Sequence, residues 1–195
     1  SGLLDIASGA DMELDGAFLQ DGAGSVQTAG DITTTSDAIT FTTDVTLTDG
    51  ESLAIDTGAG GGSITFSASL DGTTDFAEDL QLTAGTGSID FDLAVGGTTD
   101  LGAISVVSAL DVTAAAGFNA DSFAQDAGTG DTQFDGAVLL EAAGGLAVTT
   151  STVTINSTID TLTSGNGGSV TVTNAGLLDI ASGADMELDG AFLQD

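Results

Sequence analysis

Seven amino acids are missing from this sequence of 195 residues: Lys, Arg, His, Pro, Cys, Trp and Tyr. Without a basic side chain the protein cannot neutralise phosphates, which excludes nucleic-acid binding and disfavours contact with an anionic membrane surface. The lack of cysteine excludes disulfides, thiolate metal sites and thiol chemistry. No apolar run is long enough to span a membrane, so membrane insertion is not expected. Without histidine or lysine only carboxylates remain to transfer protons, so the sequence predicts no enzyme.

The residues that are present combine high charge with high hydrophobicity. Thirty acidic residues give a formal net charge of −30, yet 41% of the residues are hydrophobic and the mean hydropathy is +0.31. An acidic disordered tail would be poor in Val, Ile, Leu and Phe. The composition therefore favours a folded chain with a sizeable core.

One stretch of sequence occurs twice. The segment "GLLDIASGADMELDGAFLQD" at 2–21 returns unchanged at 176–195, an offset of 174 residues. Identity at a fixed offset is typical of a tandem array. We therefore expect residues 1–195 to form one continuous solenoid, with 2–175 as one unit and 176–195 as the start of the next. The two copies should be related by translation and twist along one axis.

Apolar residues alternate with polar ones almost throughout. Segments with this alternation lie at 39–48, 53–56, 63–66, 80–83, 88–93, 110–113, 146–149, 152–155 and 169–173. Alternation rich in β-branched residues predicts half-buried strands. Only 111–123 hints at a helix, and Gly117 interrupts it. The sequence therefore predicts an all-β protein.

Three features favour a parallel β-helix, also called a β-solenoid, over a sandwich. The strands are short, glycine-rich corners separate them, and Ile39, Ile64 and Ile89 follow one another at intervals of 25 residues. A coil of three short strands and their corners takes about 20–30 residues, so a unit of 174 residues would hold about seven to eight coils. At about 4.8 Å per coil, one unit would rise roughly 34–38 Å.

The segments "GSITF", "LTAGTGSIDF", "AVGGTTDLGAISV" and "ALDVTAA", which lie between residues 62 and 115, give the chain its texture. It resembles the repeat arrays of very large bacterial surface proteins of the filamentous-haemagglutinin and giant-adhesin type. This resemblance implies secretion to the cell surface or the extracellular space. It also implies a rod-like parallel β-helix with adhesive or scaffolding work.

Two acidic segments are candidate metal sites. Strand alternation in "ADMELDG" places Asp11, Glu13 and Asp15 on the outer face, and "IDFDL" does the same with Asp90 and Asp92. Carboxylates about 7 Å apart along a strand suit Ca²⁺, which takes oxygen ligands in flexible geometry. The alternative is a solvated acidic face without a bound ion.

The total charge predicts cations as partners even without a specific site. Two carboxylates stacked one coil apart repel by about 0.9 kcal/mol in water, and the chain has no basic group to relieve a column of them. Coil stacking is expected to bring Asp71, Asp75 or Asp135 into neighbouring rows. Inorganic cations should therefore collect along the solenoid.

The function that fits best is a structural one: a segment of a long extracellular β-solenoid fibre whose units join end to end. The alternative is an adhesin stalk, or a calcium-dependent surface-layer module, whose binding tip lies elsewhere. Threonine pairs raise ice binding, but they fall irregularly rather than once per coil. Polysaccharide lyases and hydrolases use β-helices, but binding an acidic polysaccharide without Arg or Lys would be very difficult.

Overall fold

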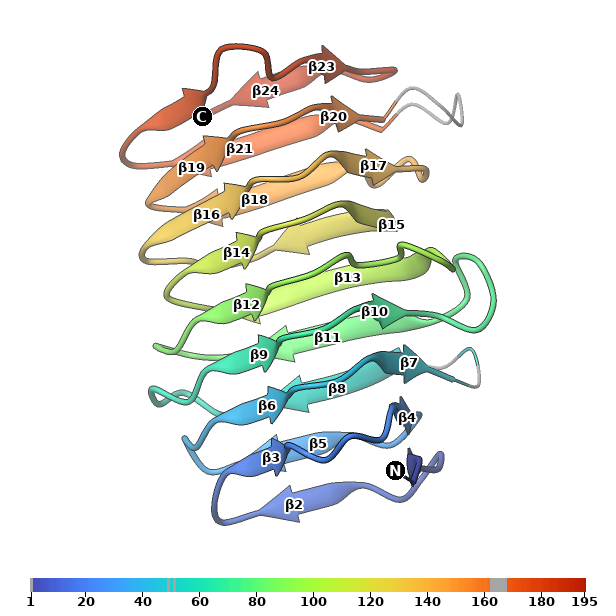
Figure 1. The fold of residues 1–195 in the computed structure, drawn as a ribbon. Coiled ribbons are helices and arrows are strands. Elements are labelled where there is room, and N and C mark those ends of the chain that lie inside the picture. The colour runs from blue at the N-terminus through green and yellow to red at the C-terminus, as the bar shows by residue number, and fades with distance from the viewer. Residues whose placement is uncertain (1, 49, 51, 162–167) are drawn as a thin grey trace.

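The computed structural model describes residues 2–48, 50, 52–161 and 168–195, which form 24 strands and no helix. Every strand pairing among these residues is parallel, and the strands wind about one axis in a β-solenoid of about eight turns (Figure 1). The prediction of an all-β parallel β-helix is confirmed. The alternation that predicted strands is also the alternation of burial, since the pattern buried–intermediate–buried recurs along the chain.

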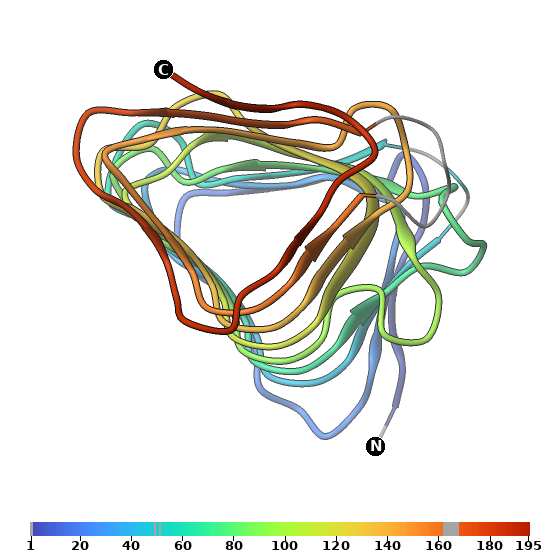
Figure 2. The same ribbon diagram turned by 90° about the horizontal axis from the view of Figure 1, so that it is seen from above.

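The strands lie on three faces, which form a triangle when the solenoid is viewed along its axis (Figure 2). Face 1 holds β1 (Leu4–Ile6), β4 (Val26–Thr28), β7 (Val45–Leu47), β10 (Leu70–Asp71), Val95, the first half of β15 (Phe118–Gln125), β17 (Val138–Leu140), β20 (Ile159–Asp160) and β23 (Met186–Glu187). Face 2 holds β2 (Met12–Leu14), β5 (Ile32–Thr34), β8 (Ser52–Asp56), β11 (Asp79–Thr83), β13 (Leu101–Ser108), the second half of β15, β18 (Leu146–Thr150), β21 (Val170–Asn174) and β24 (Phe192–Gln194). Face 3 holds β3 (Phe18–Gln20), β6 (Ile39–Phe41), β9 (Ile64–Phe66), β12 (Ile89–Phe91), β14 (Val112–Ala114), β16 (Asp131–Phe134), β19 (Thr152–Ile155) and β22 (Leu178–Ile180).

Long strands carry the sheet around one corner. Residues 118–120 of β15 pair with β17 on face 1, while residues 123–125 pair with β18 on face 2. The segment that hinted at a helix, 111–123, therefore contains β14 and most of β15. Because β15 joins the two faces, the ladders of faces 1 and 2 are continuous in the upper half of the solenoid.

Inward side chains form columns along the axis. Ile39, Ile64 and Ile89 are direct partners in one column of face 3, and all three are fully buried. The 25-residue interval is therefore the coil period in this part of the chain. The same column continues at Val112 and Thr132, so the period shortens to 23 and then 20 residues.

A ladder of phenylalanine rings fills the core beside that column. Phe41, Phe66 and Phe91 stack nearly parallel, with ring centroids 5.2 and 5.4 Å apart. Ala114 occupies the next position of the column, and Phe118 from face 1 meets Phe91 edge-on at 5.8 Å. Offset stacking and edge-to-face contacts are both favourable ring geometries, so the ladder continues although the column loses its phenylalanine.

Glycines allow successive corners to stack. A Cβ on Gly87 would lie 2.2 Å from the carbonyl oxygen of Gly62 one coil below. A side chain at this corner would therefore force neighbouring coils apart. The glycine clusters that the sequence placed at corners do lie there.

Candidate functional site

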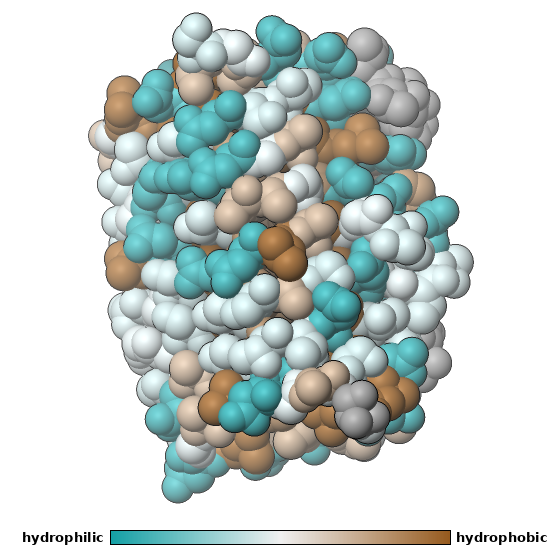
Figure 3. Space-filling view, in the orientation of Figure 1, coloured by the Kyte–Doolittle hydropathy of each residue, from teal (hydrophilic) through white to brown (hydrophobic). Residues whose placement is uncertain are grey.

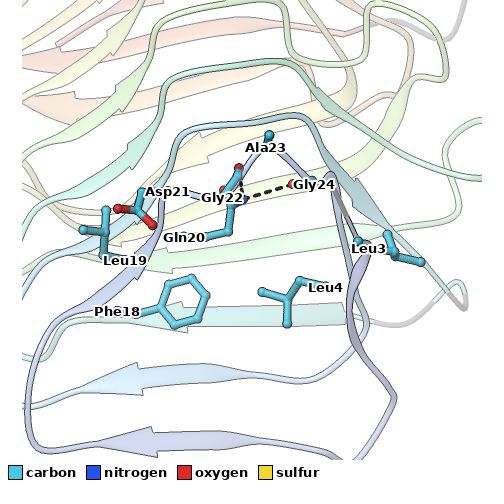
Figure 4. A pocket seen from close by; sticks show the side chains of 10 residues that line it. Leu3, Leu4, Phe18, Leu19, Gln20, Asp21, Gly22, Ala23 and Gly24 are labelled. Carbon is cyan, nitrogen blue, oxygen red and sulfur yellow. Dashed lines mark hydrogen bonds between the residues drawn. The ribbon is translucent and has the colours of Figure 1, made fainter.

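The largest hollow lies at the N-terminal end of the solenoid. Residues 2–4 and 18–24 line a space of about 520 Å³, and Leu4 and Phe18 form its apolar floor (Figure 4). Gln20 folds over the neighbouring corner and donates from Nε2 to the carbonyl oxygens of Gly22 and Gly24, at 2.9 and 3.0 Å. Asp21 is the one ionisable side chain in this lining. The hollow is the open end of the core, and it offers no acid–base pair.

Aspartates join successive coils at the corners. Asp11 Oδ1 accepts the backbone N–H of Asp31 at 3.1 Å, and Asp31 Oδ1 in turn accepts the N–H of Ala54 at 2.8 Å. Further pairs, with the acceptor first, are Asp44 with Ser69, Asp71 with Thr98, Asp75 with Asp100, Asp79 with Ala103, and Asp111 with Asp131. In each pair the donor belongs to the next coil.

The physical reason is that the regular ladder ends where the chain turns a corner, which leaves N–H groups in need of an acceptor. A carboxylate accepts more strongly than a neutral group, and such a bond contributes about 1.5–3 kcal/mol. Sequence analysis missed this role. The available signal is position, because Asp11, Asp31, Asp44 and Asp111 each immediately precede a strand.

The first candidate metal segment is engaged in these contacts. Besides Asp11, the Oδ1 atom of Asp15 accepts the hydroxyl of Thr35 at 3.1 Å, while Glu13 is exposed on β2. The segment lies on face 2 of the first coil, whereas the second candidate segment lies on face 3 of the fourth coil. Across the described ranges, no three acidic side chains gather closely enough to hold a metal ion.

The second segment is where carboxylates crowd most. Asp90 projects outward from β12, half-buried, and burial raises its pKa, with further upward contributions from Asp92 and from Asp111 on the next coil. Asp92 is exposed. The structure thus adds Asp111 to the pair expected from the sequence, and it shows that ionisation of Asp90 is unfavourable in the fold.

The acids expected in neighbouring rows lie in two different settings. Burial raises the pKa of Asp100, as do Asp75 and, more weakly, Asp71, while a hydrogen bond from Asn119 lowers it. Asp135 instead accepts hydrogen bonds from two side-chain amides, of Gln133 and Asn156, both at 2.7 Å. Asp71 and Asp75 therefore share a crowded site with Asp100, whereas Asp135 is held by neutral donors.

The two copies of the repeated segment form the two end coils, on different faces. The residues of β1, β2 and β3 lie on faces 1, 2 and 3, whereas the identical residues of β22, β23 and β24 lie on faces 3, 1 and 2. The second copy is therefore rotated by one face, about a third of a turn, relative to the first. The tandem pattern alone did not predict this rotation.

The end coils also differ in what covers them. Ile6 and Phe18 are 5% and 8% exposed under the second coil, whereas their counterparts Ile180 and Phe192 are both 41% exposed. Several other exposed large hydrophobic side chains lie in the same end coils: Leu3, Leu19, Leu177 and Leu193. Figure 3 shows hydrophobic side chains at the lower end and mostly polar ones along the sides. The apolar surface of the molecule therefore gathers at its ends.

Comparison with known proteins gives no relative. No protein-family model matches the chain, and neither a curated protein nor a solved structure is similar to it. Over the described residues no helix is long and apolar enough to cross a membrane. The likeness to adhesin repeat arrays remains a prediction from sequence texture.

Proposed function

We propose that this chain is a structural segment of a long extracellular β-solenoid fibre. The observation that carries the proposal is that strand stacking runs from the first coil to the last on all three faces, and that both end coils leave their outer strand edges unpaired. An unpaired parallel edge is a template for another strand. Such a molecule can be extended along its axis without any change in the way its coils pack.

Three kinds of contact would carry tension along the fibre. Backbone hydrogen bonds connect each coil to the next, the phenylalanine ladder and aliphatic columns form a continuous core, and aspartates join coils at the corners. In a solenoid each coil contacts mainly its neighbours, so stability grows by repetition of the same interface. The acidic flanks repel one another between fibres, which favours growth at the ends over sideways clumping.

The second candidate function is a calcium-dependent surface-layer module or adhesin stalk. The observation that favours it is the crowding of Asp90, Asp92 and Asp111, where a bound cation would relieve repulsion. This candidate and the fibre share the same rod, and they differ in whether calcium is needed for the rod to persist.

Sedimentation over a range of protein concentrations, together with electron microscopy, tests the fibre proposal. We expect unbranched filaments one solenoid wide, whose mean length increases with concentration. A compact monomer that persists at high concentration would contradict the proposal. Repeating the experiment with a calcium chelator separates the two candidates, because filaments that survive chelation exclude the calcium-dependent module.

A further inference from the structure

The free edge of the C-terminal coil is identical in sequence to the surface on which this chain already stacks its second coil. Within the chain β1, β2 and β3 carry β4, β5 and β6, with Leu4, Met12 and Phe18 in register with Val26, Ile32 and Ile39. Residues 176–195 repeat that first coil letter for letter. Their pairing uses one edge only, because β22, β23 and β24 contact β19, β20 and β21.

We propose that β22–β24 of one chain bind β4–β6 of a second copy of this chain, in place of that copy's own β1–β3. This proposal rests on the fibre function and names its joint. The hydrogen bonds that would form are those seen within the chain, such as Phe18 N–H to Ala38 O at 3.0 Å and Ala29 N–H to Ile6 O at 2.9 Å. Phe192 and Ile180 would take the places of Phe18 and Ile6.

Polar groups at the free end are suited to the same partner. In the first coil Asp11 and Asp15 accept hydrogen bonds from the second coil, and Gln20 Oε1 accepts the N–H of Thr42 at 3.2 Å. Their counterparts are Asp185, Asp189 and Gln194. Among the described residues no donor reaches the carboxylates of Asp185 and Asp189. A second copy would supply those donors from its residues 31 and 35.

Charge favours this exchange over simple abutment of two intact ends. If β1–β3 met β22–β24 directly in the same register, identical residues would face each other, so Asp5 would stack on Asp179 and Glu13 on Glu187. Each such pair repels. In the exchanged joint the outward pairs follow the internal register: Asp179 with Gln27, Glu187 with Thr33, and Leu193 with Thr40. No outward pair then brings two charges together.

The joint fixes the geometry of the assembly. From β4 to β24 the chain is one strand position short of eight turns, so β4 of the second copy would extend face 3 of the first. Each added chain is therefore rotated by about a third of a turn. Three chains bring the faces back into line, and any feature on one face follows a slow spiral along the fibre.

The chain has no cysteine, so single cysteines can report the joint. Two single-cysteine chains, Leu193→Cys and Thr40→Cys, are mixed in denaturant, refolded together and oxidised. Within one chain these positions are seven coils, roughly 34 Å, apart, too far for a disulfide. We expect a disulfide-linked heterodimer well above the level of either homodimer. The matched mixture of Leu193→Cys with Leu19→Cys reports abutment and should give no such excess.

A single chain with both Leu19→Cys and Thr40→Cys is the positive control, since these residues are cross-strand partners in the monomer and should form an intrachain disulfide. An excess of heterodimer in the Leu193–Leu19 mixture, or in neither mixture, would overturn the exchanged joint. Electron microscopy of the refolded samples distinguishes the two failures. Filaments without the Leu193–Thr40 link would refute this joint alone, whereas the absence of both would refute the fibre as well.

Discussion

Replacing Asp31 with alanine should destabilise the solenoid, while the same replacement at Asp90 should leave it equally stable or stabilise it. Both changes remove one negative charge and the same side-chain atoms. Asp31 Oδ1 accepts the N–H of Ala54 at 2.8 Å, so its loss leaves a partly buried donor without that acceptor. Asp90 makes no such bond, and the fold disfavours its charge through burial and through Asp92 and Asp111.

The expected size of the Asp31 effect follows from the hydrogen bond. A bond to a charged acceptor contributes about 1.5–3 kcal/mol to the free energy of unfolding. With a urea m-value of about 2 kcal/mol per molar, the midpoint of Asp31→Ala should fall by about 0.75–1.5 M. Relief of general repulsion, which is the same in both variants, acts in the opposite direction.

Urea unfolding followed by circular dichroism measures both variants against the unchanged chain. Urea is preferred to guanidinium chloride because it is uncharged and leaves the repulsion unscreened. If Asp31→Ala and Asp90→Ala shift the midpoint by the same amount in the same direction, net charge alone matters. The proposed role of corner aspartates would then be wrong.

Other changes test other parts of the structure. Phe66→Ala removes the middle ring of the stacked ladder and should cost about 3–5 kcal/mol in thermal or urea unfolding, and a loss under 1 kcal/mol would contradict the packing. Gln125 Nε2 is the buried side-chain polar atom that has no partner among the described residues, and Gln125 Oε1 accepts the hydroxyl of Thr132 at 2.6 Å. The pair Gln125→Met and Thr132→Val should therefore be at least as stable as the unchanged chain and more stable than Gln125→Met alone, as judged by melting temperature. Burial raises the folded-state pKa of Asp90 and Asp100 above 3.8, so the folded state binds these protons more tightly than the unfolded chain. A variant with asparagine at both positions should be more stable than the unchanged chain at neutral pH, and its advantage should vanish as the pH falls to about 3.8. Calcium should raise the melting temperature at far lower concentration than sodium, and coinciding curves at matched ionic strength would leave only diffuse screening.

Sequence reasoning succeeded where the signal is local. The interval between Ile39, Ile64 and Ile89 is the coil period because an inward residue must stack on an inward residue of the next coil. It became unreliable beyond residue 93, where corner lengths change and the column continues at Val112 and Thr132. A pattern of alternation locates a strand but does not count the residues in a corner.

The candidate metal residues show the opposite case. Alternation predicts that Asp11 and Asp90 point outward, yet it cannot separate an aspartate that accepts a backbone N–H from one crowded by other carboxylates. The partner of Asp11 lies 20 residues away and the neighbour Asp111 lies 21 residues from Asp90. Such separations become contacts only when the coil length at that place is known.

The sequence by itself determined that this chain is an acidic all-β solenoid, because strand alternation, glycine corners and apolar columns are properties of short segments repeated along it. Only the tertiary structure decided which face each strand occupies. The same twenty residues lie on faces 1, 2 and 3 at one end and on faces 3, 1 and 2 at the other. The physical reason is that a short strand packs equally well on any face of a triangular core. Its position is set by the total length of the corners before it, which the structure adds up over the whole chain.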